Sequence, residues 1–135
     1  MTLTQLFTFV GAPLANNRWS WGAVRPKDGA VFLRVWQDEC RAIDGMQMVQ
    51  ITFHKWFMDN PGNLGYTERL KHINLIRGGA PSYMVMCEAV DIKASPRTVK
   101  SFNDREIFIG GKLTDHAGDS WLQRVERRPV GKVRA

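Results

Sequence analysis

The stretch Asn16-Asn17-Arg18-Trp19-Ser20-Trp21-Gly22 places two tryptophans two residues apart in a polar segment that favours a turn. A tryptophan in such a segment either fills a core or forms a wall against which a flat or cationic ligand can stack. If the chain is extended through Ser20, the rings of Trp19 and Trp21 share one face. If the chain turns there, one ring can pack inward while the other stays available. The sequence leaves both alternatives open, and this stretch is its strongest candidate for a binding site.

Short apolar or alternating runs separated by turn residues occupy most of the remaining chain. They predict strands at residues 6–10, 30–36, 46–53, 83–92, 99–102, 107–109 and 121–125. Residues 65–77 predict the main helix, with Thr67 as its candidate cap and Gly78-Gly79 at its end. This order predicts an α+β fold, either a small twisted β-barrel or a strongly curved mixed sheet, with one main helix and short flanking helices.

Length and composition indicate one soluble globular domain. The chain has 135 residues, of which 44% are hydrophobic and 24% charged. We predict a domain at residues 1–128 and a frayed basic tail at 129–135. Cys40 and Cys87 are far apart and lack the spacing of a zinc site, which suits a reducing cytoplasm. No signal peptide and no membrane-length apolar run is visible, so we expect a cytoplasmic protein without metal, cofactor or membrane partner.

The net charge of +6 favours an anionic partner, most simply nucleic acid, although a solvated basic surface would give the same total. The basic residues cluster toward the C-terminus. There a single acid, Glu126, stands among Arg124, Arg127, Arg128, Lys132 and Arg134.

Catalytic motifs are weak. Glu106 and Lys112 are spaced too widely for the carboxylate–lysine alternation of metal-dependent nucleases. The histidines lack a metal-ligand partner three or four residues away, and no Gly-x-Ser-x-Gly elbow exists. We therefore expect a protein that is not an enzyme, with a nuclease as the least favoured reading.

The tryptophan stretch and two later passages resemble the PUA-like superfamily, in particular its EVE and YTH branches. The resemblance rests on a first strand at residues 5–10 that enters Asn-x-Trp-Ser-Trp-Gly, on the Val31–Trp36 run, and on a helix ending in Gly78-Gly79 before residues 83–89. It covers roughly residues 5–125 as order and pattern. It implies a twisted barrel with an aromatic pocket for a flipped, modified base. In some bacterial proteins such a domain is fused to an HNH nuclease, for which this chain has no room.

The resulting hypothesis is a non-catalytic nucleic-acid-binding domain that recognises a modified base, in DNA rather than RNA. A separate nuclease or host protein is a further expected partner. The expected base pocket consists of Asn17, Trp19, Ser20, Trp21, Trp36 and Trp56. The expected phosphate contacts are Arg18, Arg25, Lys27, Arg124, Arg127 and Arg128. The alternative is a small protein-binding module or inhibitor of phage or plasmid origin that acts on a host factor, because tryptophan and arginine also dominate protein interfaces.

Overall fold

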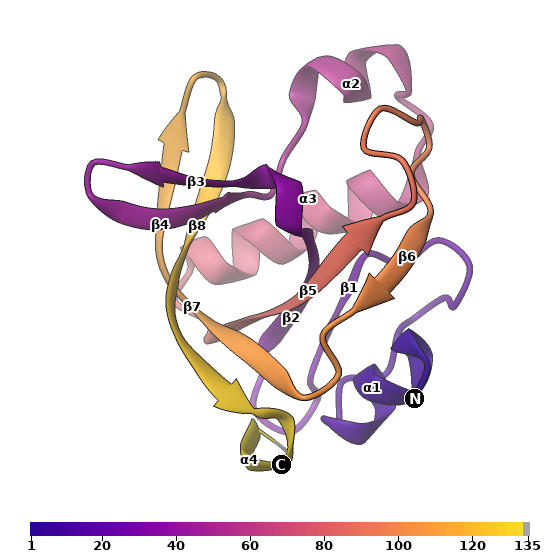
Figure 1. Ribbon diagram of the computed structural model, residues 1–135, viewed down its shortest axis with the longest axis vertical. Coiled ribbons are helices and arrows are strands. Elements are labelled where there is room, and N and C mark those ends of the chain that lie inside the picture. The colour runs from indigo at the N-terminus through magenta and orange to yellow at the C-terminus, as the bar shows by residue number, and fades with distance from the viewer. Residues whose placement is uncertain (134–135) are drawn as a thin grey trace.

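The computed structural model describes residues 1–133 and has an α+β architecture (Figure 1). Its helices are α1 (Leu3–Phe9), α2 (His54–Asp59), α3 (Leu64–Arg77) and α4 (Val130–Val133). Its strands are β1 (Gly22–Val24), β2 (Val31–Trp36), β3 (Cys40–Ile43), β4 (Met46–Gln50), β5 (Ser82–Ala89), β6 (Val99–Phe102), β7 (Glu106–His116) and β8 (Asp119–Pro129).

The eight strands form one sheet in the order β1-β2-β5-β7-β8-β4-β3, with β6 paired to β5 outside this path. The β2–β5 pair is parallel, and the other pairs are antiparallel. The sheet is not closed, since β1 and β3 end the path without pairing to each other. The strands therefore form a curved mixed sheet, and the expected barrel closure is absent from this strand order.

Two tight turns and a pair of bulges shape the long strands. Asp44-Gly45 and Ala117-Gly118 both have positive φ at their two positions, as two-residue hairpin turns of type I′ require. The β7–β8 pairing shifts register near Gly110, and such bulges bend and twist a strand pair. The β7–β8 hairpin thus leaves the plane of the other strands (Figure 1).

Two cores lie on opposite faces of β2. Phe32 faces the first core, which α1 and α4 cover with Leu6, Phe7, Val10, Val130 and Val133. Leu33 faces the second core, to which α3 contributes Ile73 and Ile76. This division confirms the alternation read from the sequence of β2.

The prediction of a strand at residues 6–10 is wrong, because this segment belongs to α1. Thr2 and Gln5 form a reciprocal capping box, with Gln5 N–H donating to Thr2 Oγ1 at 3.1 Å and Thr2 N–H to Gln5 Oε1 at 2.8 Å. Leu6, Phe7 and Val10 are buried at helical spacing. The first of the three features of the resemblance is therefore absent.

Three further expectations change in the structure. Residues 54–59, for which no helix was predicted, form α2, and β1 and β3 were not predicted. The N-cap of α3 is Asn63, whose side chain accepts from Tyr66 N–H at 2.9 Å, and not Thr67. Val130 and Val133 are buried in the first core, so the segment expected as a free tail from residue 129 is packed as far as Val133; Arg134 and Ala135 lie outside the described residues.

Candidate functional site: an aromatic cluster beside the tryptophan loop

Residues Asn16–Gly22, which we call the tryptophan loop, turn before they enter β1. The side-chain oxygen of Asn16 accepts from Arg18 N–H at 2.8 Å and from Trp19 N–H at 3.3 Å, and its carbonyl accepts from Ser20 N–H at 3.0 Å. Ser20 is buried, whereas Trp19 and Trp21 are both half-buried. Within residues 1–133, the ring of Trp21 contacts other aromatic rings, whereas that of Trp19 contacts none.

The ring of Trp21 joins an aromatic cluster made of Trp21, His54, Trp56, Phe57 and Tyr66. The ring centroids of Trp21 and Trp56 lie 5.9 Å apart at a tilt of 42°. Tyr66 is fully buried at the centre, edge-on to Trp21 at 5.9 Å and stacked on Phe57 at 4.4 Å. The fold thus unites the tryptophan loop with α2 and the first turn of α3.

Hydrogen bonds fix α2 over this cluster. Tyr66 Oη accepts from Phe53 N–H at 2.8 Å and lies 2.8 Å from His54 Nδ1. Burial raises the pKa of the Tyr66 phenol, so its hydroxyl keeps its proton at neutral pH. At the far side of α2, Trp56 Nε1–H donates to Ser95 Oγ at 2.8 Å. The orientation of Trp56 is therefore set by two separate parts of the chain.

Gly65 allows the tryptophan loop to approach α3 closely. A Cβ atom at this position would lie 2.5 Å from Trp19 O and would also meet Trp21 Nε1. Only glycine fits between the helix and the loop, so the absence of a side chain is part of how the site is built.

Arg69 forms the floor beneath the cluster and was not predicted as a site residue. It is 2% exposed, and its guanidinium donates to the carbonyl oxygens of Ile51 at 3.0 Å, Trp21 at 3.1 Å and Arg34 at 2.5 Å. Burial lowers its pKa to about 10, so it remains charged at neutral pH. The sequence could have indicated that Arg69 is buried, because it lies on the same helical stripe as Ile73 and Ile76.

Two further titratable side chains of α3 lie beside the loop. Glu68 Oε2 accepts from Ser20 Oγ at 3.1 Å, and burial raises the pKa of this carboxyl. Burial, followed by the charge of Arg69, lowers the pKa of His72 to about 4. His72 is therefore neutral at physiological pH, and the site carries its positive charge on arginine.

The remaining predicted pocket residues are placed differently. Trp36 packs against the first core under the guanidinium of Arg97, which lies 5.3 Å from the ring centroid. Within residues 1–133, Trp36 makes no ring contact with the aromatic cluster. Asn17 is exposed on the tryptophan loop. The structure therefore joins Trp21 and Trp56, places Trp19 and Asn17 next to them, and leaves Trp36 apart.

The predicted phosphate contacts do not form one surface. Arg25 is 6% exposed and donates to Asp28, to Val10 O at 3.1 Å and to Val133 O at 2.6 Å, so we remove it from the phosphate set. Lys27 is exposed in the same turn. Arg18 is exposed on the tryptophan loop and forms no ion pair within residues 1–133.

The three predicted arginines of β8 lie in its middle and toward its end at Pro129. This end of β8 is beside α4, whereas α2 lies at the opposite end of the molecule (Figure 1). Arg124 and Arg127 both stack on Phe108, with 5.2 and 5.4 Å to its centroid. Arg128 pairs with Glu126 at 2.9 Å. These arginines form a second basic region that is separate from the tryptophan loop.

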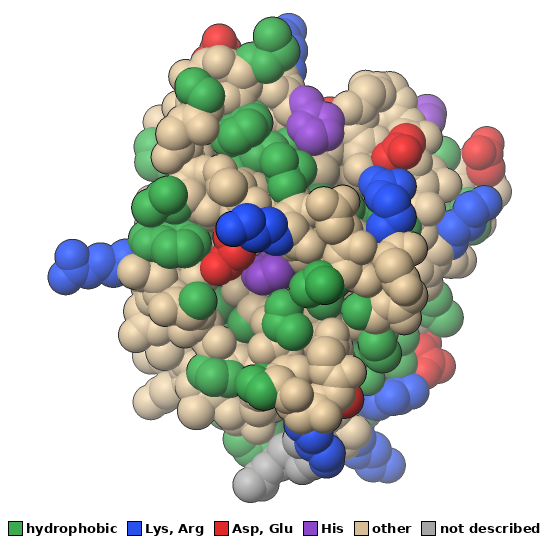
Figure 2. Space-filling view, turned by 180° about the vertical axis from the view of Figure 1, so that it is seen from behind, with side chains coloured by type: hydrophobic (Ala, Val, Ile, Leu, Met, Phe, Trp, Pro, Cys, Tyr) green, Lys and Arg blue, Asp and Glu red, His purple; other side chains and the backbone are tan. Residues whose placement is uncertain are grey.

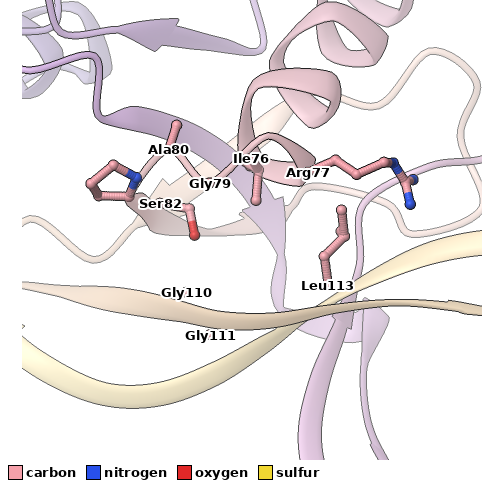
Figure 3. A pocket seen from close by; sticks show the side chains of 9 residues that line it. Ile76, Arg77, Gly79, Ala80, Ser82, Gly110, Gly111 and Leu113 are labelled. Atoms are coloured by element: carbon pink, nitrogen blue, oxygen red, sulfur yellow. The ribbon is translucent and has the colours of Figure 1, made fainter.

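Two surface hollows lie away from the aromatic cluster. One of about 380 Å³ runs between the end of α3 and the glycines of the β7 bulge, and Figure 3 shows Ser82 and Leu113 projecting into it from opposite sides. Another of about 400 Å³ lies between α1 and β6. From behind, Figure 2 shows a notch between the lobe of α2 and the lobe of the β7–β8 hairpin, with green hydrophobic side chains on the α2 side. Lysine and arginine side chains are dispersed over this face.

Comparisons with family models, with curated proteins and with solved structures found no match to the chain. Within residues 1–133, no helix has the length and apolarity needed to cross a bilayer. No group of three or more metal-ligating side chains lies together in the same part of the chain.

Proposed function

We propose that this protein is a nucleic-acid-binding domain without catalytic activity, and that it takes a modified base, turned out of its stack, onto the aromatic cluster. The observation that carries the proposal is the contact between half-buried Trp21 and half-buried Trp56 from segments distant in sequence, with half-buried Trp19 on the same loop as Trp21. A tryptophan that is fixed but half-exposed offers a base a preformed stacking surface, worth roughly 1–3 kcal/mol per base. Because Trp21 and Trp56 already touch, we expect the base to stack on an outer ring face and not between them.

The cations that accompany this surface are Arg18 and Lys55, each adjacent in sequence to a tryptophan of the site. Both are exposed, and neither forms an ion pair with another described residue. Such side chains can contact phosphates and release counterions, which makes binding salt-dependent. The β8 arginines and Lys27 would reach only a longer nucleic acid that continues across the sheet.

The test is fluorescence anisotropy with matched oligonucleotides, plain and base-modified, at two salt concentrations. We expect Trp56→Ala to weaken binding of the modified oligonucleotide by about 5- to 150-fold, the equivalent of one lost stack. Arg128→Ala is the control, since its partner is Glu126 on the same strand. Equal affinity of the protein for plain and modified oligonucleotides would reject base recognition, and no binding at low salt would reject the whole proposal.

A second candidate function is binding of a protein partner, favoured by exposed apolar side chains near α2. Met58 is 80% exposed and Leu64 56%, and the segment that holds Trp56 carries Val90 at 63% and Ile92 at 53%. Exposed apolar side chains of this kind are more typical of a docking surface than of a free one. Met58→Asp should abolish capture of a protein partner while oligonucleotide affinity stays within twofold; the reverse result favours nucleic acid.

A further inference from the structure

Among residues 1–133, Arg34 is a half-buried arginine whose guanidinium has neither a carboxylate partner nor a hydrogen bond of ordinary length. It lies in the middle of β2 and is half-buried on the face that carries Phe32 and Trp36. The single hydrogen bond of its side chain, from Nη1 to Ser20 O, is 3.4 Å long, beyond the usual range for N–H···O bonds. Its Nε is buried with no acceptor, as are the Nε atoms of Arg69 and Arg124. A donor of this kind needs an explanation, because nearly all buried polar groups are paired.

Other enclosed arginines of this chain have guanidinium groups with more or shorter hydrogen bonds than Arg34. Arg25 is paired with Asp28, and Arg97 with Asp38 and Glu39. Arg69 lacks a carboxylate but donates to three carbonyl oxygens. Arg34 has neither arrangement, so its lack of a partner is a property of its position.

The surroundings of Arg34 add positive charge and supply no neighbouring anion. Arg69 Nη2 reaches the carbonyl oxygen of Arg34 itself. The nearby thiol of Cys87 has its pKa raised to about 11 by burial, so it stays neutral. Glu68 accepts from Ser20 and forms no ion pair with Arg34. Partial burial of an uncompensated charge is strongly unfavourable. Ionisable side chains in such unfavourable surroundings are typical of ligand sites.

We propose that Arg34 and the tryptophan loop bind an oxyanion of the phosphate class, either free phosphate or the phosphate of a nucleotide. A guanidinium offers parallel N–H donors that match two oxygens of a phosphate, which a single long bond to a carbonyl does not. Asn17 and Arg18 precede Ser20, the residue that touches Arg34, by three and two positions on the same loop, and they are the candidates for further donors. Both are exposed, and neither side chain has a hydrogen bond or ion pair with another of residues 1–133.

Arg34 takes no part in the stacking surface of the proposed function, although Arg18 is a candidate contact in both sites. Phosphate binding at Arg34 needs no flipped base, and stacking on Trp56 needs no Arg34. If the protein binds phosphate but no oligonucleotide, the phosphate site stands and the proposed function is rejected. If it binds the oligonucleotide but no phosphate, the proposed function stands and the phosphate site is rejected.

The test measures thermal unfolding and tryptophan fluorescence of the whole chain during titration with inorganic phosphate, with sodium chloride at matched ionic strength as the blank. At ten times its Kd, phosphate should raise the unfolding midpoint by about 5 °C. Arg34→Gln should remove this shift, and in phosphate-free buffer it should unfold at the wild-type temperature or above, because an uncompensated charge is gone. Arg97→Gln is the matched control: it should lower the midpoint but retain the phosphate shift.

Persistence of the shift in Arg34→Gln, or its absence in the wild type, would overturn the proposal. If Arg34→Gln does not fold, the Nε–H resonance of Arg34 in wild-type protein gives the same decision, since it must move on addition of phosphate. A nucleoside 5′-monophosphate that binds at least tenfold tighter than inorganic phosphate, with no binding of the nucleoside, assigns the site to nucleotides. Equal affinities assign it to the free ion.

Discussion

Arg25, Arg34 and Arg69 are three of the arginines that lie wholly or partly inside the protein, and each has a different environment. Arg25 combines a carboxylate with two backbone carbonyls and stacks over Phe32 at 5.1 Å. Arg69 uses carbonyl oxygens alone and thereby ties the tryptophan loop to β2. Arg34 has a single long bond. Arg25 and Arg69 thus hold parts of the structure together, whereas Arg34 is a candidate ligand-binding residue.

Removal of the carboxylate at position 28 tests the clamp at Arg25. The Arg25 hydrogen bonds lower the pKa of Asp28 to about 2. Because the pKa of Asp28 is lower in the folded protein than in the unfolded chain, this carboxylate stabilises the fold fully above about pH 4, and the stabilisation is lost as the pH falls toward 2. We expect Asp28→Asn to lower the free energy of unfolding by about 1–2 kcal/mol at pH 7, measured by urea denaturation. The exposed Asp44→Asn is the control, and an equal effect of both would contradict the clamp.

His72 should make the stability of the protein depend on pH through a base whose pKa is lowered. Its folded-state pKa is about 4, below the ordinary value of 6.5, so between these values the unfolded chain binds more protons than the folded one. Stability should therefore fall as pH decreases from about 6.5 to 4. In a series of unfolding midpoints against pH, His72→Gln should flatten the slope in this window. The raised pKa of Glu68 acts in the other direction, so an unchanged slope in the variant would show that His72 is not the source.

At the scale of elements, α1 shows why the first strand prediction failed. The apolar run at residues 6–10 suits a strand by residue type, but the capping box of Thr2 and Gln5 precedes it. The buried positions Leu6, Phe7 and Val10 then fall on one helical face. The spacing of the apolar residues indicates a helix here, whereas residue type alone suggested a strand.

The junction of α3 and the tryptophan loop is the most sensitive element of the candidate site. Alanine usually stabilises a helix relative to glycine by roughly 0.5–1 kcal/mol, but at position 65 its Cβ would displace Trp19 O and Trp21. We expect Gly65→Ala to destabilise the protein by about 1–3 kcal/mol and to change its tryptophan fluorescence.

The control for this variant is Gly62→Ala, because a Cβ at Gly62 meets nothing within 4 Å. Its unfolding midpoint and emission spectrum should match the wild type. If Gly65→Ala proves as stable as the wild type, the loop does not rest against α3 as described.

At the scale of the molecule, α4 closes the first core. Val130 is 5% and Val133 4% exposed, and Val133 O accepts from Arg25 Nη1 at 2.6 Å. Deletion of residues 130–135 should therefore cost roughly 3–6 kcal/mol from the two buried valines, seen as a large drop in the thermal midpoint by calorimetry. The exposed Lys132→Gln should leave the midpoint unchanged. A truncated protein of wild-type stability would restore the free tail expected from the sequence.

Sequence reasoning located β2, β4, α3, β5 and β6, because alternation and helical periodicity are local properties. It predicted only part of β7 and of β8, and it found the tryptophan loop. It missed β1, β3, α2 and the packing of α4. These are short elements whose stability comes from distant partners, such as Asp119 Oδ1 for His54 N–H in α2.

The sequence by itself determined the α+β class, the two-faced pattern of β2 and the presence of tryptophans beside cations, since each follows from residue type and spacing. Only the tertiary structure decided which tryptophans meet. Trp21 joins Trp56 through α2, whereas Trp36 faces the first core. It also decided that Arg25 is a clamp and that Arg34 has no adequate partner. The physical reason is that burial and pairing depend on residues far apart in the chain, which the curved sheet and α3 bring together.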